Sequence, residues 1–128
     1  MGQQILIVED EVDIRDSLCE FLELDGFSPV TAVNGLEALK QLRDGLRPTL
    51  ILLDLTMPIM NGWQFLEERN QDAMLRAIPV VVLTAGTQQA QSLGAQAFIR
   101  KPFRLQVLRD TVHKICGGGA ITAPSNTL

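Results

Sequence analysis

The sequence predicts an α/β fold in which a parallel sheet is covered by helices on both faces. Two observations lead to this prediction. The apolar runs are short and continuous, without polar alternation, which is typical of strands buried on both faces. Segments with helical spacing of apolar residues separate these runs, which is the pattern of repeated βα units. We therefore expect a five-stranded, doubly wound (βα)5 domain.

The strands are expected at Gln4–Val8, Phe27–Ala32, Leu50–Leu53, Ile78–Leu83 and Ala97–Arg100. Proline cannot donate to a β ladder, so Pro29 predicts an edge position for the second strand. For five βα units the flavodoxin-like order 2-1-3-4-5 is common, and it places the first and third strands side by side.

The helices are expected at Asp13–Leu24, Leu36–Asp44, Asn61–Asn70 and Leu105–Cys116. Asn34 is predicted to be the N-cap of the second of these helices. Between the fourth and fifth strands there is room for only a shortened fourth helix, around Gln88–Leu93 and ended by Gly94.

Length and composition indicate one domain. We expect this domain at residues 1–116 and a flexible tail or linker stub at residues 117–128, because the latter begins with three glycines. This division suits both a stand-alone protein and a part of a longer one. The net charge of −4 argues against nucleic acid as a direct partner, since phosphate binding requires a basic face.

The remaining composition favours a cytoplasmic protein that does not contact the membrane. No apolar run approaches the ~20 residues that span a bilayer, and the N-terminus shows no signal-peptide pattern. Cys19 and Cys116 fall within helical patterns and are expected to be free, buried or half-buried thiols. Arg15 and His113 are expected to be solvated charges or polar groups on helix surfaces.

Polar side chains follow four of the predicted strands. Glu9 and Asp10 follow the first strand, Asp54 the third, Thr84 the fourth and Lys101 the fifth. Because ligands bind at the carboxyl ends of parallel strands, these side chains are expected to converge. Two carboxylates ~4 Å apart repel by roughly 4 kcal/mol, which calls for a cation or a raised pKa. Oxygen ligands suit Mg²⁺, and an aspartate can act as nucleophile in phosphoryl transfer.

Several separated motifs resemble the receiver domain of bacterial two-component response regulators, the family of the chemotaxis regulator CheY. The matching segments are Ile7-Val8-Glu9-Asp10-Glu11, Leu53-Asp54-Leu55-Thr56-Met57-Pro58-Ile59-Met60-Asn61-Gly62, Leu83-Thr84-Ala85 and Lys101-Pro102-Phe103. The resemblance extends over roughly residues 4–116, so that residues 1–116 would be a receiver domain.

The resemblance implies a role for each site residue. Asp54 would be the phosphoacceptor. Mg²⁺ would be held by Asp10, by Glu9 through water, by Asp54 and by the backbone carbonyl of Thr56. The phosphoryl group would be contacted by Lys101, Thr84 and the Ala85 amide, and the Lys101–Pro102 peptide bond would be cis.

The function expected from the resemblance is a phosphoacceptor signalling switch. Asp54 would accept a phosphoryl group from a sensor histidine kinase or a histidine phosphotransfer protein, and an interaction surface would change. The domain would be no enzyme beyond its own phosphorylation and dephosphorylation. The alternative is an interaction module that ignores phosphorylation, because the shortened fourth helix alters the usual output face. A phosphatase similar to the haloacid dehalogenases would need an acidic residue where Thr56 stands.

Overall fold

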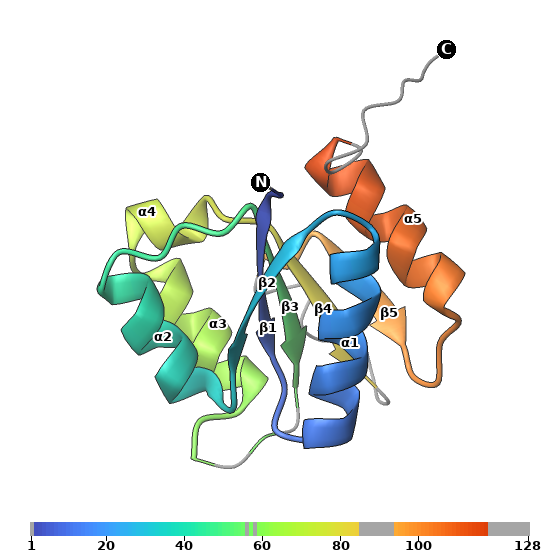
Figure 1. Ribbon diagram of the computed structural model, residues 1–128. Helices are drawn as coiled ribbons and strands as arrows, with labels where there is room; N and C mark the ends of the chain where they lie inside the picture. Colours follow the sequence, from blue (N-terminus) through green and yellow to red (C-terminus); the bar gives the residue numbers. More distant parts are fainter. Residues whose placement is uncertain (1, 56, 58, 85–93, 118–128) are drawn as a thin grey trace.

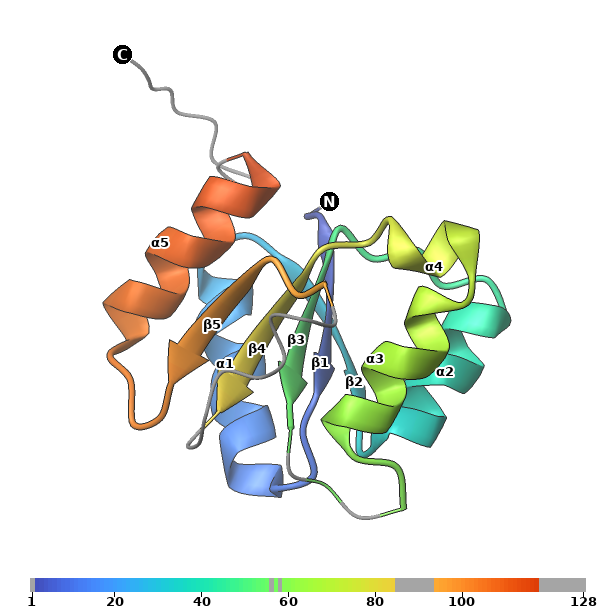
Figure 2. The ribbon, with the colours of Figure 1, turned by 180° about the vertical axis from the view of Figure 1, so that it is seen from behind.

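A parallel sheet of five strands, in the order β2-β1-β3-β4-β5, forms the centre of the domain. The computed structural model describes residues 2–55, 57, 59–84 and 94–117. Helices cover both faces of the sheet, with α1 and α5 on one side and α2 and α3 on the other (Figure 1; Figure 2 shows the opposite view). The strands are β1 (Gln4–Val8), β2 (Ser28–Ala32), β3 (Leu50–Asp54), β4 (Val80–Thr84) and β5 (Ala97–Arg100). The predicted fold class and strand order are confirmed.

Strand positions agree with the sequence prediction to within two residues. Pro29 lies in the edge strand β2, opposite Ile5 of β1, as its missing N–H requires. The fourth strand begins at Val80 and not at Ile78, because Ile78 still donates its backbone N–H to Leu75 in the preceding turn.

The helices are α1 (Val12–Leu24), α2 (Gly35–Arg43), α3 (Gly62–Asn70), α4 (Ala73–Arg76) and α5 (Leu105–Cys116). The predicted cap of α2 is confirmed, since the Asn34 side chain accepts a hydrogen bond of 2.8 Å from the Glu37 amide. α4 was not predicted. The expected shortened helix around 88–93 lies outside the described residues, as does the expected tail at 117–128 apart from Gly117.

Two apolar cores explain why the strands are apolar without alternation. In β1, Leu6 and Val8 belong to the core beneath α2 and α3, whereas Ile5 and Ile7 belong to the core beneath α1 and α5. All four side chains are fully buried. A strand covered on both faces therefore needs an apolar residue at every position.

The surface prediction for His113 is wrong. His113 is half-buried on α5: its Nε2 contacts Oδ2 of Asp25, and its ring packs edge-on against Phe27 with the centroids 5.8 Å apart. Arg109 donates to the other oxygen of Asp25 at 3.2 Å. The turn after α1 is therefore tied to α5 by a polar cluster.

The two cysteines are free thiols, as predicted. Cys116 is buried, and burial raises the pKa of its thiol to about 11, which makes it unreactive. Among the described helices, none has the length and apolar character needed to cross a membrane.

Candidate functional site

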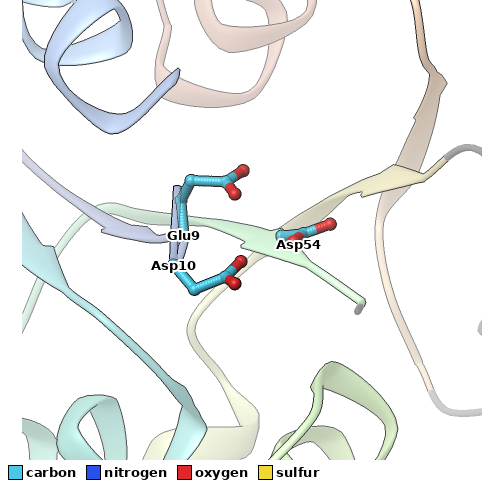
Figure 3. Close-up of side chains that lie close together, drawn as sticks. All are labelled: Glu9, Asp10 and Asp54. Carbon is cyan, nitrogen blue, oxygen red and sulfur yellow. The ribbon is translucent and has the colours of Figure 1, made fainter. Parts of the chain in front are cut away.

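Three carboxylates meet at the carboxyl edge of the sheet. Glu9 and Asp10 directly follow β1, and Asp54 is the last residue of β3 (Figure 3). The pairing of Val8 with Leu53 brings these strand ends side by side. Each of the three carboxylates offers an oxygen within 4.8 Å of the others. Glu9 and Asp54 are buried, with 1% and 7% of their surface exposed, while Asp10 faces solvent.

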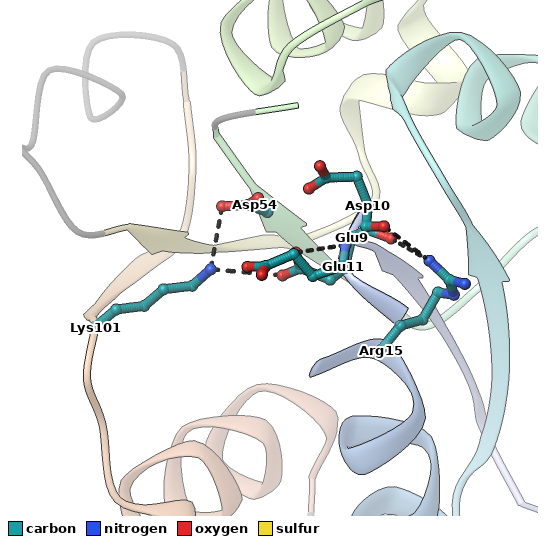
Figure 4. Close-up of polar contacts among 6 residues, drawn as sticks. All are labelled: Glu9, Asp10, Glu11, Arg15, Asp54 and Lys101. Carbon is teal, nitrogen blue, oxygen red and sulfur yellow. Dashed lines mark hydrogen bonds and ion pairs between the residues drawn. The ribbon is translucent and has the colours of Figure 1, made fainter. Parts of the chain in front are cut away.

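The lysine that directly follows β5 completes the cluster. Nζ of Lys101 lies 3.3 Å from Oδ1 of Asp54 and 3.5 Å from Oε1 of Glu9 (Figure 4). The backbone places it there, because its amide donates to the Thr84 carbonyl at 2.7 Å as β4 and β5 end together. The predicted cis bond between Lys101 and Pro102 is confirmed.

Burial and neighbouring charges shift the pKa values of both Glu9 and Lys101. Burial, reinforced by the charge of Asp54, raises the pKa of Glu9 from 4.5 to about 7, although Lys101 works in the opposite direction. Burial lowers the pKa of Lys101, but the Asp54 and Glu9 carboxylates outweigh this, so that its pKa is raised overall. The two carboxylates therefore favour the charged form of Lys101.

The β1–α1 loop is held in place by a residue that the sequence analysis did not select. Nη1 of Arg15 donates to the carbonyl of Glu9 at 2.9 Å and lies 3.4 Å from that of Asp10 (Figure 4). The expectation of a solvated Arg15 is wrong. On sequence alone, the residue is one more charge in the first turns of a helix.

The β3–α3 connection positions Asp54 through close backbone contacts. The amide of Gly62 donates to the Leu55 carbonyl at 2.9 Å. A Cβ at Gly62 would lie 2.8 Å from the backbone oxygen of Asp54, which is too close for any other residue. Asn61 caps α3 in a reciprocal pair of hydrogen bonds with Gln64.

The structure brings together most of the side chains expected at the site. Glu9, Asp10, Asp54 and Lys101 form one cluster, and Thr84 is buried at the end of the neighbouring strand β4. The other two expected residues, Thr56 and Ala85, lie outside the described residues. Within the described part of the chain, the atoms of this cluster that could bind a metal are carboxylate oxygens, which a hard divalent ion such as Mg²⁺ prefers.

Comparison with known proteins agrees with this geometry. Residues 5–113 match the response regulator receiver domain. The chain belongs to this family. Receiver domains are phosphoacceptor switches in two-component signalling and not true enzymes, and the acidic pocket of Glu9, Asp10 and Asp54 is present here.

Three relatives illustrate the family. The phosphate regulon transcriptional regulatory protein PhoB of Klebsiella pneumoniae is 43% identical over 108 residues, which are 80% of this chain and 47% of PhoB. This chain thus spans about half the length of that regulator. The sporulation initiation phosphotransferase F of Bacillus subtilis is 35% identical over 119 residues, which are 89% of this chain and 94% of that protein. The crystal structure of the signal receiver domain of a histidine kinase from Syntrophus aciditrophicus superposes with a TM-score of 0.84 at 34% identity, covering 98% of each chain.

Proposed function

We propose that Asp54 is the phosphoacceptor and that it receives the phosphoryl group from a phosphohistidine on a sensor kinase or a phosphotransfer protein. The observation that carries this proposal is the contact of Asp54 with Lys101 at 3.3 Å inside a cluster of three carboxylates. Asp54 is the member of the cluster that ends the central strand β3, at the carboxyl edge of the sheet.

The transfer is a substitution at phosphorus. A carboxylate oxygen of Asp54 forms the new O–P bond, the N–P bond of phosphohistidine breaks, and its electron pair remains on the imidazole. Lys101 then faces an acyl phosphate where it had faced a carboxylate, and its ammonium group offsets the added negative charge. Thr84, at the end of the neighbouring strand β4, would donate its hydroxyl to a phosphoryl oxygen.

Magnesium fits the site by its donor chemistry. Glu9, Asp10, Asp54 and the backbone carbonyl of Thr56 would hold the ion, with Glu9 acting through water. The bound ion would supply neutralisation of charge on the phosphoryl oxygens. The Ala85 amide would contact the phosphoryl group.

The wider setting is also part of the proposal. Residues 1–116 would form the receiver domain and residues 117–128 a tail or linker. The phosphorylated domain would present a changed surface to a downstream protein. We place the protein in the cytoplasm, where the free thiols of Cys19 and Cys116 stay reduced.

The direct test is intact mass after incubation with an acyl phosphate donor and Mg²⁺. We expect a gain of one phosphoryl group that disappears with a chelator and in Asp54→Asn. Asp44→Asn, an exposed aspartate at the end of α2, is the matched control and should be modified like the wild type. A wild-type protein that binds Mg²⁺ but gains no mass would refute the proposal and favour an interaction module that ignores phosphorylation.

A further inference from the structure

We infer that Arg15 is a positioning residue for the metal-binding part of the site. It holds the β1–α1 loop in the conformation that aims the Glu9 and Asp10 carboxylates at Asp54. This inference rests on the proposed function, because it assigns Arg15 a part in assembling the same site.

The geometry links one side chain to both loop residues. Arg15 lies in the first turns of α1, and its guanidinium turns back toward the sheet edge (Figure 4). Nη1 donates to the Glu9 carbonyl at 2.9 Å and lies 3.4 Å from the Asp10 carbonyl. The helix fixes the base of this side chain, because the Arg15 amide donates to the Glu11 carbonyl at 2.9 Å.

Arg15 differs from Lys101 in how it acts. Lys101 contacts the carboxylates themselves, at 3.3 Å and 3.5 Å. Arg15 belongs to none of the ion pairs among the described residues, and its contacts are with main-chain oxygens. It therefore fixes where the loop carbonyls lie without occupying the space between the carboxylates.

The loop needs such a support because its side chains repel one another. Glu9, Asp10 and Asp54 each offer a carboxylate oxygen within 4.8 Å of the others, and like charges this close repel. Released from Arg15, the exposed Asp10 can move away from Asp54 and lower the repulsion. A cation that binds all three carboxylates would then have to restore the loop conformation, and its affinity would fall.

The chain contains a matched control for this arrangement. Nη1 of Arg47 donates to the carbonyls of Leu42 and Leu46, at 2.7 Å and 2.8 Å. Arg47 lies in the connection from α2 to β3, near the amino end of the sheet. There the Thr49 amide donates a hydrogen bond to the Gln4 carbonyl. Both arginines thus bridge two backbone carbonyls, but only Arg15 does so at the carboxylate cluster.

The test compares Arg15→Gln, Arg15→Lys and Arg47→Gln by titration calorimetry with MgCl₂. We expect Arg15→Gln to weaken Mg²⁺ binding about tenfold, Arg15→Lys to lose less, and Arg47→Gln to match the wild type. In Arg15→Gln, the Mg²⁺ concentration that gives half-maximal phosphorylation should rise to the same extent. The phosphorylation rate of this variant at saturating Mg²⁺ should stay within about twofold of the wild-type rate. The melting temperature in chelator should fall no further in Arg15→Gln than in Arg47→Gln.

Unchanged Mg²⁺ affinity in Arg15→Gln, or equal losses in Arg15→Gln and Arg47→Gln, would overturn the inference. So would a wild type without Mg²⁺ affinity. Failure of the proposed function has another signature, since Mg²⁺ would bind with its expected dependence on Arg15 but Asp54 would gain no phosphoryl group.

Discussion

Nζ of Lys101 lies 3.3 Å from Oδ1 of Asp54, although 47 positions separate the two residues in the sequence. The contact exists because β3, β4 and β5 are neighbours and end at the same edge. The Lys101 side chain is 22% exposed and that of Asp54 only 9%, so the pair is poorly screened by water. In the metal-free protein, the ammonium group of Lys101 therefore partly neutralises the carboxylates of the pocket.

Replacing Lys101 with methionine keeps its apolar stem and removes this charge. We expect the metal-free protein to lose about 1–3 kcal/mol of unfolding free energy at pH 8, because the buried carboxylates lose their partner. Mg²⁺ affinity should rise, because a competing cation is gone. Urea denaturation in chelator and calorimetry measure the two effects.

The control is Lys40→Met. The ion pair between Lys40 and Asp44 has the same 3.3 Å distance as that between Lys101 and Asp54, but both of its side chains are more than half exposed. Exposed helix pairs contribute about 0.3–0.5 kcal/mol, so this variant should remain close to the wild type. Equal losses in the two lysine variants would show that burial does not strengthen the Lys101 contacts.

Glu9 makes metal-free stability depend on pH. Its pKa is about 7 in the folded protein against an ordinary 4.5, so between these values the folded state holds a proton that the unfolded chain has released. Stability therefore falls as the pH rises through this window, by at most about 1.4 kcal/mol per pH unit. Glu9→Gln cannot ionise and should become more stable than the wild type by about 2–3 kcal/mol at pH 8, but not at pH 4.

Chemical denaturation across this pH range in chelator checks the prediction. Glu11→Gln is the control, since Glu11 is exposed two positions away and should change the pH profile little. A stability difference between Glu9→Gln and the wild type that stays constant from pH 4 to pH 8 would contradict the assignment of the titration to Glu9.

Ile59 carries backbone strain beside the site. Its φ is 68°, a left-handed conformation that is unfavourable for a β-branched residue, and the residue is 76% exposed. Removing the Ile59 side chain should therefore cost little packing energy. Ile59→Gly is expected to raise the unfolding free energy by about 1 kcal/mol, whereas Ile59→Ala keeps the Cβ and most of the strain. Thermal denaturation distinguishes the two, and an equal effect of Gly and Ala would argue against strain.

The sequence predicted those features that depend on short apolar runs and on the residues directly after each run. Ile5–Val8 and Leu50–Leu53 need to be apolar at every position because each strand is covered on both faces. Since parallel strands end at one edge, the residues at their carboxyl ends, including Asp54 and Lys101, could be placed together without coordinates. The family motifs then supplied their roles.

The features that were missed depend on tertiary contacts or on very short segments. α4 spans four residues, Ala73–Arg76, too few to show helical periodicity. Arg15 and His113 look like solvated helix residues until the β1–α1 loop and the Asp25 turn are placed beside them. A polar residue on a helix surface gives no sign in the sequence of which backbone or side chain it will meet.

Arg69 is the most buried case of this kind, with 2% of its surface exposed. Nη2 donates to the carbonyls of Arg76 and Ile78 at 3.0 Å and 2.8 Å, and Nη1 donates to Oδ1 of Asn70 at 2.9 Å. No ion pair among the described residues includes it, and burial lowers its pKa. The Arg69 side chain thus supplies hydrogen-bond donors to backbone carbonyls at the end of α4 and in the connection to β4.

Arg69→Met should therefore destabilise the protein, although it replaces a buried charge with an apolar side chain. Exchange of a buried ion pair for apolar residues is often neutral, but here the removed donor leaves the carbonyls of Arg76 and Ile78 without that partner. We expect a loss of about 2–4 kcal/mol in urea denaturation, against little change for the exposed Arg76→Met. If Arg69→Met were as stable as the wild type, the free energy gained by removing a buried charge would equal or exceed that lost with the two carbonyl hydrogen bonds. Arg69 would then not stabilise the folded protein.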